Sequence, residues 1–147
     1  MKLSTKSEYG LRAMLSIAMN DAGSATSVTD ISKEEGISVA YLEQLLNKLR
    51  REGLVESVRG PRGGYVISKR VDSITVGDIV KTLEGSLYPA SCIAAHSGSH
   101  GACKKSKGCV PKTVWIRLAK AVNDCLESIT LSDLCMETKK KELRRKT

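Results

Sequence analysis

The sequence predicts a mainly helical fold, a winged helix-turn-helix with a two-stranded wing and a long C-terminal helix. Two amphipathic segments separated only by a Gly-Ile-Ser turn predict the helix-turn-helix, and two alternating segments around an Arg- and Gly-rich turn predict the wing. A helical pattern of about 19 residues near the C-terminus predicts the long helix. Among 147 residues there are no Phe and one Trp, so aliphatic side chains must fill the core, which favours packed helices.

The first two helices are indicated by apolar residues at helical spacing and by capping residues. Within 7–20 the apolar stripe is formed by Leu11, Met14, Leu15 and Ala18. The polar segment 21–26 interrupts this pattern. A second helix is predicted over 28–35, because Ser27 suits the N-cap position and Gly36 offers a left-handed stop.

The third helix is the predicted recognition helix, which in this motif enters the DNA major groove. It begins at the cap residue Ser38 and ends near Gly53, and its buried face is formed by Leu42, Leu45, Leu46 and Leu49. The candidates for contact with bases and phosphates point away from that face: Ser38, Tyr41, Glu43, Gln44 and Lys48. Gln44 suits adenine and Glu43 suits cytosine, although Glu43 and Lys48 are equally typical of a solvated helix face.

The wing is predicted directly after the recognition helix. Segments 54–58 and 65–68 alternate as strands do, and turn-forming residues occupy 59–64 between them. The tip of this hairpin contains Arg59, Gly60 and Arg62. Because a thin hairpin projects guanidinium groups well, we expect both arginines to reach the minor groove or flanking phosphates.

The remaining chain is predicted to contain a fourth helix from Thr75 to Glu84, an irregular loop over 85–110 and a long helix over 111–129. The long helix has more apolar surface than one small domain covers, so we expect it to pair with a second copy in a twofold dimer. Four parts are therefore expected: a DNA-binding domain (1–84), a cysteine-rich loop (85–110), a dimerisation helix with its cap (111–135) and a flexible basic tail (136–147).

Charge is concentrated in two basic segments. The chain has a net charge of +8, and 48–70 and 139–147 each hold a net +5. Such patches indicate a polyanionic partner, and the motif makes that partner double-stranded DNA. The tail allows two interpretations, a solvated terminus or a phosphate-binding segment. No apolar run approaches the about 20 residues that span a membrane, so a cytoplasmic protein is expected.

Five cysteines, an odd number, argue against a disulfide framework and favour metal or redox chemistry. Cys92, Cys103 and Cys109 lie in the loop with His96 and His100, so one metal centre is within their reach. Thiolates favour zinc or an iron-sulfur cluster, and the spacing does not choose between them. We expect Cys125 to be a small core residue, because it lies on the apolar stripe, and we see no evident partner for Cys135.

Catalysis is not expected, nor is a small-molecule substrate. The sequence has no CxxC pair and no glycine-rich phosphate loop after a strand, and only two histidines are available for a catalytic set.

The chain resembles the bacterial iron-sulfur cluster regulator family, the IscR-like proteins with nitric oxide, iron and redox sensors as relatives. The resemblance covers roughly residues 1–135 and is carried by the segments ISVAYLEQLLNKLRREGLVESVRGPRGGYVISK, ITVGDIV, VWIRL and ITLSDL. It implies a homodimeric winged-helix transcription factor whose cluster is bound by Cys92, Cys103 and Cys109, and whose affinity for a palindromic operator changes with cluster state.

Two departures leave the fourth ligand and the cluster type open. Where family members with a histidine ligand place it three residues after the last loop cysteine, this chain has Lys112. Nitric oxide sensors of the family use an acidic residue from the first helix of the second subunit, and Glu8 stands at that position. As fourth ligand we therefore expect Glu8 first and then His96 and His100. A 2Fe-2S cluster is expected, with 4Fe-4S as its alternative. The competing hypothesis is the same regulator with zinc or a thiol redox switch.

Overall fold

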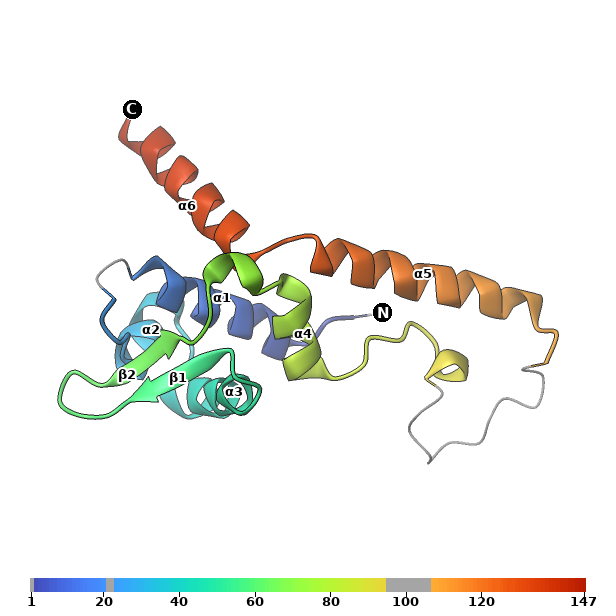
Figure 1. Cartoon of the computed structure of the whole chain (residues 1–147), viewed down its shortest axis with the longest axis horizontal. Coiled ribbons are helices and arrows are strands. Elements are labelled where there is room, and N and C mark those ends of the chain that lie inside the picture. The colour runs from blue at the N-terminus through green and yellow to red at the C-terminus, as the bar shows by residue number, and fades with distance from the viewer. Residues whose placement is uncertain (1, 21–22, 95–106) are drawn as a thin grey trace.

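The computed structural model describes residues 2–20, 23–94 and 107–147. Along the chain these form α1 (Thr5–Met19), α2 (Val28–Glu35), α3 (Val39–Arg51), β1 (Val55–Val58), β2 (Gly64–Ile67), η1 (Val71–Ser73), α4 (Val76–Glu84), η2 (Ser91–Ile93), α5 (Val110–Glu127) and α6 (Leu131–Lys146). Helices form a body around α1, with the two strands at one side, and α5 extends away from it (Figure 1). The mainly helical winged helix-turn-helix fold is confirmed.

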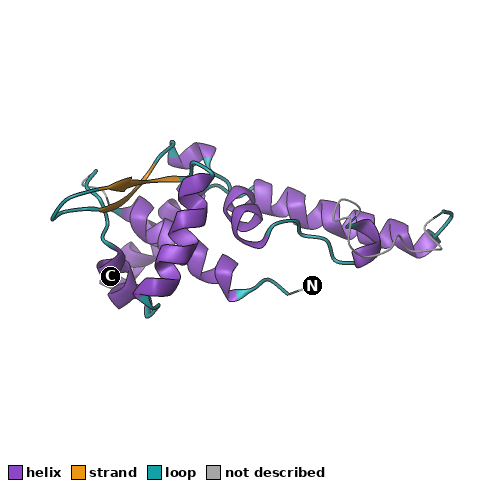
Figure 2. Ribbon diagram, turned by 90° about the horizontal axis from the view of Figure 1, so that it is seen from below, coloured by secondary structure: helices purple, strands orange, loops and turns teal. Residues whose placement is uncertain are grey.

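The core of the body is aliphatic, as the absence of phenylalanine requires. Helix α1 packs against α2, α3, α4 and α6 and against β2. Fully buried side chains come from the apolar faces of these elements, among them Met14, Ile31, Leu42, Leu46, Ile79 and Leu131. Figure 2 shows the same arrangement from below, with the strand pair at the edge of the helical body.

Capping residues fix the two helices of the helix-turn-helix. The Ser27 side chain accepts a hydrogen bond from the Asp30 N–H, and Ser38 does the same for the Tyr41 N–H. Gly36 ends α2 in the left-handed conformation with φ 67°, which side chains with a Cβ rarely adopt. The predicted bounds of α2 and both caps are confirmed.

The wing is an antiparallel pair whose register runs from Val55 opposite Ile67 to Val58 opposite Gly64. A further residue extends it: Thr26 bridges Tyr65 through two backbone hydrogen bonds of 2.9 Å. A side chain at Gly64 would overlap the Thr26 carbonyl, so only glycine allows this approach. The wing is thereby held by the segment before α2, a contact that the local sequence pattern does not reveal.

A second isolated bridge joins the start of α4 to the start of α6. Thr75 pairs with Thr130, through hydrogen bonds from the Val76 N–H to the Ile129 carbonyl and from the Leu131 N–H to the Ile74 carbonyl, both 2.8 Å. Each threonine is the N-cap of its helix in a full capping box. We call this pair of caps the threonine clip.

Helix α5 is largely exposed in the single chain. Ala119 is its one buried residue, and the exposed large side chains are Val110, Val114, Trp115, Ile116 and Leu118. The expectation of a core position for Cys125 is wrong in the single chain, where this residue is exposed. The physical reason is that α5 projects from the body, so its apolar stripe meets little of the rest of the described residues.

The expectation of a flexible basic tail over 136–147 is also wrong, because α6 continues to Lys146. Helix formation has two local causes: the capping box at Thr130 and Asp133, and a following segment free of glycine and proline. Three basic residues in the last turn also favour the helix, since positive charge stabilises a helix C-terminus.

Candidate nucleic-acid interface and cysteine site

The recognition helix α3 presents one buried and one exposed face. Its leucines are at most 2% exposed, whereas Glu43, Gln44 and Lys48 are exposed to solvent. These three side chains therefore lie where a helix-turn-helix would offer them to the major groove. Their contact with DNA stays a prediction.

Ser38 and Tyr41 have structural partners at the start of α3. The Ser38 hydroxyl caps the helix by accepting from the Tyr41 N–H at 3.3 Å. The Tyr41 ring meets Tyr9 of α1 edge to face, with centroids 5.9 Å apart, and its hydroxyl lies 3.4 Å from the Thr5 hydroxyl. Sequence reasoning missed this packing, because it depends on how α1 crosses α3.

The wing tip places Arg59, Gly60 and Arg62 in solvent. A hydrogen bond of 2.9 Å from the Gly63 N–H to the Gly60 carbonyl closes the turn, and Gly60 adopts φ 115°. Within the described ranges neither arginine forms an ion pair. Both guanidinium groups are therefore available for phosphates.

Arg70, the last base of the first basic segment, differs from the wing arginines. Its Nη2 and Nε atoms donate to the two carboxylate oxygens of Asp72 at 2.6 and 3.1 Å. The hydrogen bonds and charge of Asp72 raise the Arg70 pKa above its ordinary value. Because its guanidinium group is already paired with a carboxylate, Arg70 adds less to the positive charge of this surface than a count of basic residues in the sequence implies.

Two of the loop cysteines lie at either end of the segment that joins the body to α5. Cys92 lies in η2, which packs against α5, and Cys109 is the N-cap residue of α5. Both thiols are free and half-buried, and the Cys109 side chain makes no capping hydrogen bond. Cys103, His96 and His100 lie outside the described residues. Among the described residues no three His, Cys, Asp or Glu side chains form a metal-binding group.

Glu8, the expected fourth ligand, lies on the solvent side of α1. Its side chain is 58% exposed and pairs with Arg12 one turn later, with 2.9 Å between Oε1 and Nη2. An exposed ion pair of this kind contributes little to stability, so Glu8 is free to exchange Arg12 for another partner at small cost.

Glu84, the last residue of α4, was not among the candidates. Its Oε1 atom accepts hydrogen bonds from the Ser4 N–H at 2.8 Å, the Ser4 hydroxyl at 2.5 Å and the Ser7 hydroxyl at 2.7 Å. Burial alone would raise the Glu84 pKa, but these hydrogen bonds outweigh it and lower the pKa. An acid at a helix C-terminus opposes the helix dipole, and that local mismatch was the available signal.

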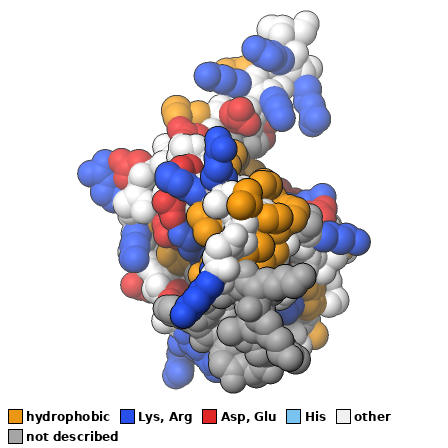
Figure 3. Space-filling view, turned by 90° about the vertical axis from the view of Figure 1, so that its right-hand side faces the viewer, with side chains coloured by type: hydrophobic (Ala, Val, Ile, Leu, Met, Phe, Trp, Pro, Cys, Tyr) orange, Lys and Arg blue, Asp and Glu red, His pale blue; other side chains and the backbone are white. Residues whose placement is uncertain are grey.

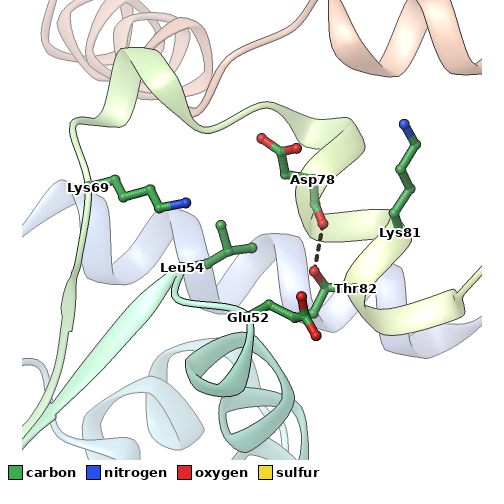
Figure 4. Close-up of a pocket in the computed structure, with 6 residues that line it drawn as sticks. All are labelled: Glu52, Leu54, Lys69, Asp78, Lys81 and Thr82. Carbon is green, nitrogen blue, oxygen red and sulfur yellow. Dashed lines mark hydrogen bonds between the residues drawn. The ribbon is translucent and has the colours of Figure 1, made fainter.

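A hollow of about 420 Å³ lies between the end of α3, the start of β1 and α4 (Figure 4). It is lined by Glu52, Leu54, Lys69, Asp78, Lys81 and Thr82. Three of these polar groups are already engaged: Asp78 accepts from the Thr75 N–H at 2.9 Å, Lys81 pairs with Glu127 of α5, and the Thr82 hydroxyl donates to the Asp78 carbonyl at 2.8 Å. This arrangement offers neither a nucleophile with its base nor a vacant set of ligands.

None of the helices in the described parts of the chain is long and apolar enough to cross a membrane.

Comparison with known proteins agrees with the fold. The Rrf2 model, described as an iron-dependent transcriptional regulator, matches residues 3–137. The HTH-type transcriptional regulator IscR of Erwinia tasmaniensis is 38% identical over 134 residues, 91% of this chain and 78% of that protein.

Two solved structures are similar along most of their length. CymR, the global cysteine regulator of B. subtilis, superimposes with a TM-score of 0.75 at 37% identity, covering 93% of this chain and 98% of CymR. T. potens IscR superimposes with a TM-score of 0.73 at 37% identity, covering 94% of this chain and 88% of that IscR chain. These relatives are regulators and not enzymes, as expected for this chain. The chain belongs to the Rrf2 family of winged-helix transcriptional regulators.

Proposed function

We propose that this DNA-binding regulator acts as a homodimer and senses iron-sulfur cluster status, redox state or nitric oxide through a cluster bound by the loop cysteines. One observation carries the proposal: two of the three loop cysteines belong to elements at α5, because Cys92 lies in η2, which packs against α5, and Cys109 is the N-cap of α5. Helix α5 is also the element with the most exposed apolar surface. Sensing and dimerisation would thus use one helix.

The dimer is supported by the exposure of α5. Val114 is 56% exposed, and Trp115 and Leu118 are each 39% exposed, within two adjacent turns of the helix. Figure 3 looks along the molecule from the free end of α5, where apolar side chains gather in one patch. A second copy of the same helix would cover this stripe with twofold symmetry and give two recognition helices for a palindromic operator.

The donor set fits a cluster in its chemistry. Thiolates are the common ligands of iron-sulfur clusters, and Cys92, Cys103 and Cys109 would supply three of them. Glu8 of a second copy is the proposed fourth ligand, with a 2Fe-2S cluster ahead of a 4Fe-4S cluster. When bound, the cluster would supply redox chemistry and reactivity toward nitric oxide, and the protein residues would hold it between two subunits.

The test is an anaerobic purification followed by absorbance, iron and acid-labile sulfide per chain. We expect the wild-type protein to be coloured. The Cys92→Ala and Cys103→Ala variants should lose their iron, and Glu8→Ala should contain less iron per chain than the wild type. Cys125→Ala is the matched control, because this exposed cysteine of α5 lies outside the proposed ligand set. Operator titrations of the loaded and cofactor-free forms should differ about 5- to 150-fold. Equal affinity of both forms would contradict cluster sensing.

A zinc or thiol-switch regulator is the second candidate, favoured by the free thiols of Cys92 and Cys109 and by the likeness to CymR. A colourless protein with zinc, or a metal-free protein whose operator affinity changes with peroxide and recovers with dithiothreitol, would support it. In the thiol case mass spectrometry should locate the oxidation at a loop cysteine.

A further inference from the structure

We propose that Glu84 is a positioning residue that couples the cysteine loop to the recognition helix through the first two turns of α1. The inference rests on the proposed function, because it names the path by which the state of the loop reaches DNA. Glu84 is the last residue of α4, immediately before residue 85, where the cysteine loop begins. Its partners lie at the other end of the body's sequence, in the first turn of α1.

The first link joins α4 to α1. One carboxylate oxygen of Glu84 accepts three hydrogen bonds, from the Ser4 N–H and hydroxyl and from the Ser7 hydroxyl. Ser7 is only 2% exposed and its hydroxyl donates to a charged oxygen, so replacing the carboxylate by a neutral amide would weaken a buried hydrogen bond. The carboxylate also lies at the N-terminus of α1, where negative charge is favoured.

Close packing beside the carboxylate makes this link stiff. Gly10, one turn after Ser7, faces Leu83, and even a methyl group on Gly10 would overlap that side chain. Interiors packed this closely transmit displacement instead of absorbing it. In the proposed path, a shift of the end of α4 therefore moves the first turns of α1.

The second link joins α1 to the recognition helix. Thr5 and Tyr9 are one turn apart on α1, and both contact Tyr41 of α3, through the paired hydroxyls and the edge-to-face rings. Tyr41 lies two residues after the start of α3 and three before Gln44. The same two turns of α1 carry Glu8 on their solvent side. Three faces of one short segment thus meet α4, the recognition helix and the proposed ligand position.

The test compares Glu84→Gln with Glu137→Gln, which removes the same charge from an exposed position on α6. Operator affinity is measured for the anaerobically isolated protein and for the protein stripped of metal by chelator and oxidant, with a duplex selected by the wild-type protein from a random library. The ratio of the two dissociation constants should shrink by about 2- to 30-fold in Glu84→Gln, the range that mutations along coupled networks produce. Glu137→Gln should keep the wild-type ratio, and an unchanged ratio in Glu84→Gln would overturn the proposal.

Hydrogen exchange of the stripped, DNA-free protein separates this proposal from the cluster hypothesis. Glu84→Gln should speed exchange in the first two turns of α1 and in the first half of α3, while α2 keeps its protection. Faster exchange confined to α1, or none, would overturn the coupling. If the wild-type protein holds no iron, the cluster hypothesis fails. The exchange measurement still shows whether Glu84 is coupled to α3 through α1.

Tyr9→Leu supplies a second variant, because it removes the ring contact and leaves the Glu84 hydrogen bonds intact. We expect it to reduce the affinity ratio as Glu84→Gln does. In the double variant the two effects should be less than additive, since both substitutions weaken one path. Full additivity would mean that the two residues act independently and would contradict the proposed coupling through α1.

Discussion

The winged-helix body and helix α5 differ in how far they bury their apolar side chains within one chain. In the body, the apolar faces of α2, α3, α4 and α6 meet around α1, and the leucines of α3 are at most 2% exposed. In α5, Ala119 alone is buried and Val110 is 76% exposed. A protein rarely leaves such a stripe open to water. The contrast therefore teaches that the body buries its apolar faces within one chain, whereas the stripe of α5 is what the proposed second copy would cover.

The comparison is tested most severely in the body, where we expect the largest effect. Leu46→Ala removes a fully buried side chain of the recognition helix and leaves a cavity, which should lower the free energy of unfolding by about 2–5 kcal/mol. Urea denaturation measures this value. The loss should not depend on protein concentration, because the cavity lies inside one chain; a strong concentration dependence would contradict a self-contained body.

The second prediction concerns α5. Leu118→Lys places a charge on the proposed dimer stripe, once in each subunit, and should raise the dimer dissociation constant by at least about 100-fold because buried unpaired charges are costly. Sedimentation equilibrium measures the constant. Thr113→Lys is the matched control, since it adds the same charge to an exposed position on the other side of α5. Monomers in the wild-type protein, or equal effects of both variants, would contradict pairing through this stripe.

A smaller effect is expected at the DNA surface of the body. Arg62→Ala removes one exposed guanidinium at the wing tip, so operator affinity should fall about equally for all DNA sequences and the slope of affinity against salt concentration should decrease by about 1.

Gln44→Ala, in the recognition helix, should instead relax specificity at one base pair, at a cost of about 1–3 kcal/mol for the correct base. Binding titrations at several salt concentrations distinguish these outcomes, and an unchanged salt slope for Arg62→Ala would remove the wing from the interface.

The smallest effect is a dependence of stability on pH. Hydrogen bonds from Ser4 and Ser7 lower the pKa of Glu84 in the folded protein, against the opposing effect of burial. The carboxylate therefore stabilises the fold fully above its unfolded pKa, and this stabilisation is lost as the pH falls through the lower, folded pKa. Glu84→Gln should be less stable at pH 7 and should lose less stability on acidification to about pH 3. Parallel acid profiles of variant and wild type would contradict this assignment.

Sequence reasoning predicted the local features and missed the long-range ones. Serine caps, the Gly36 stop and the alternation around the wing tip are short-range signals, and α2, α3, the wing and α4 follow them closely. The Thr26 bridge, the Tyr41 packing and the Glu84 hydrogen bonds join segments between about 30 and 80 residues apart, which no periodicity encodes. The error at the basic tail had another cause, since charge was given more weight than helix propensity and the Thr130 cap.

The threonine clip has a mechanical consequence. Its two hydrogen bonds of 2.8 Å hold the junction of α5 and α6 to the start of α4, and the capping boxes on both sides keep each helix beginning at a fixed residue. Because α5 is attached to the body at its C-terminal end, it can rotate about that end more easily than it can move along its axis. Any change at the far end of α5, beside Cys109, should therefore reach the body as a change of angle about a fixed hinge, magnified over the 18-residue length of the helix.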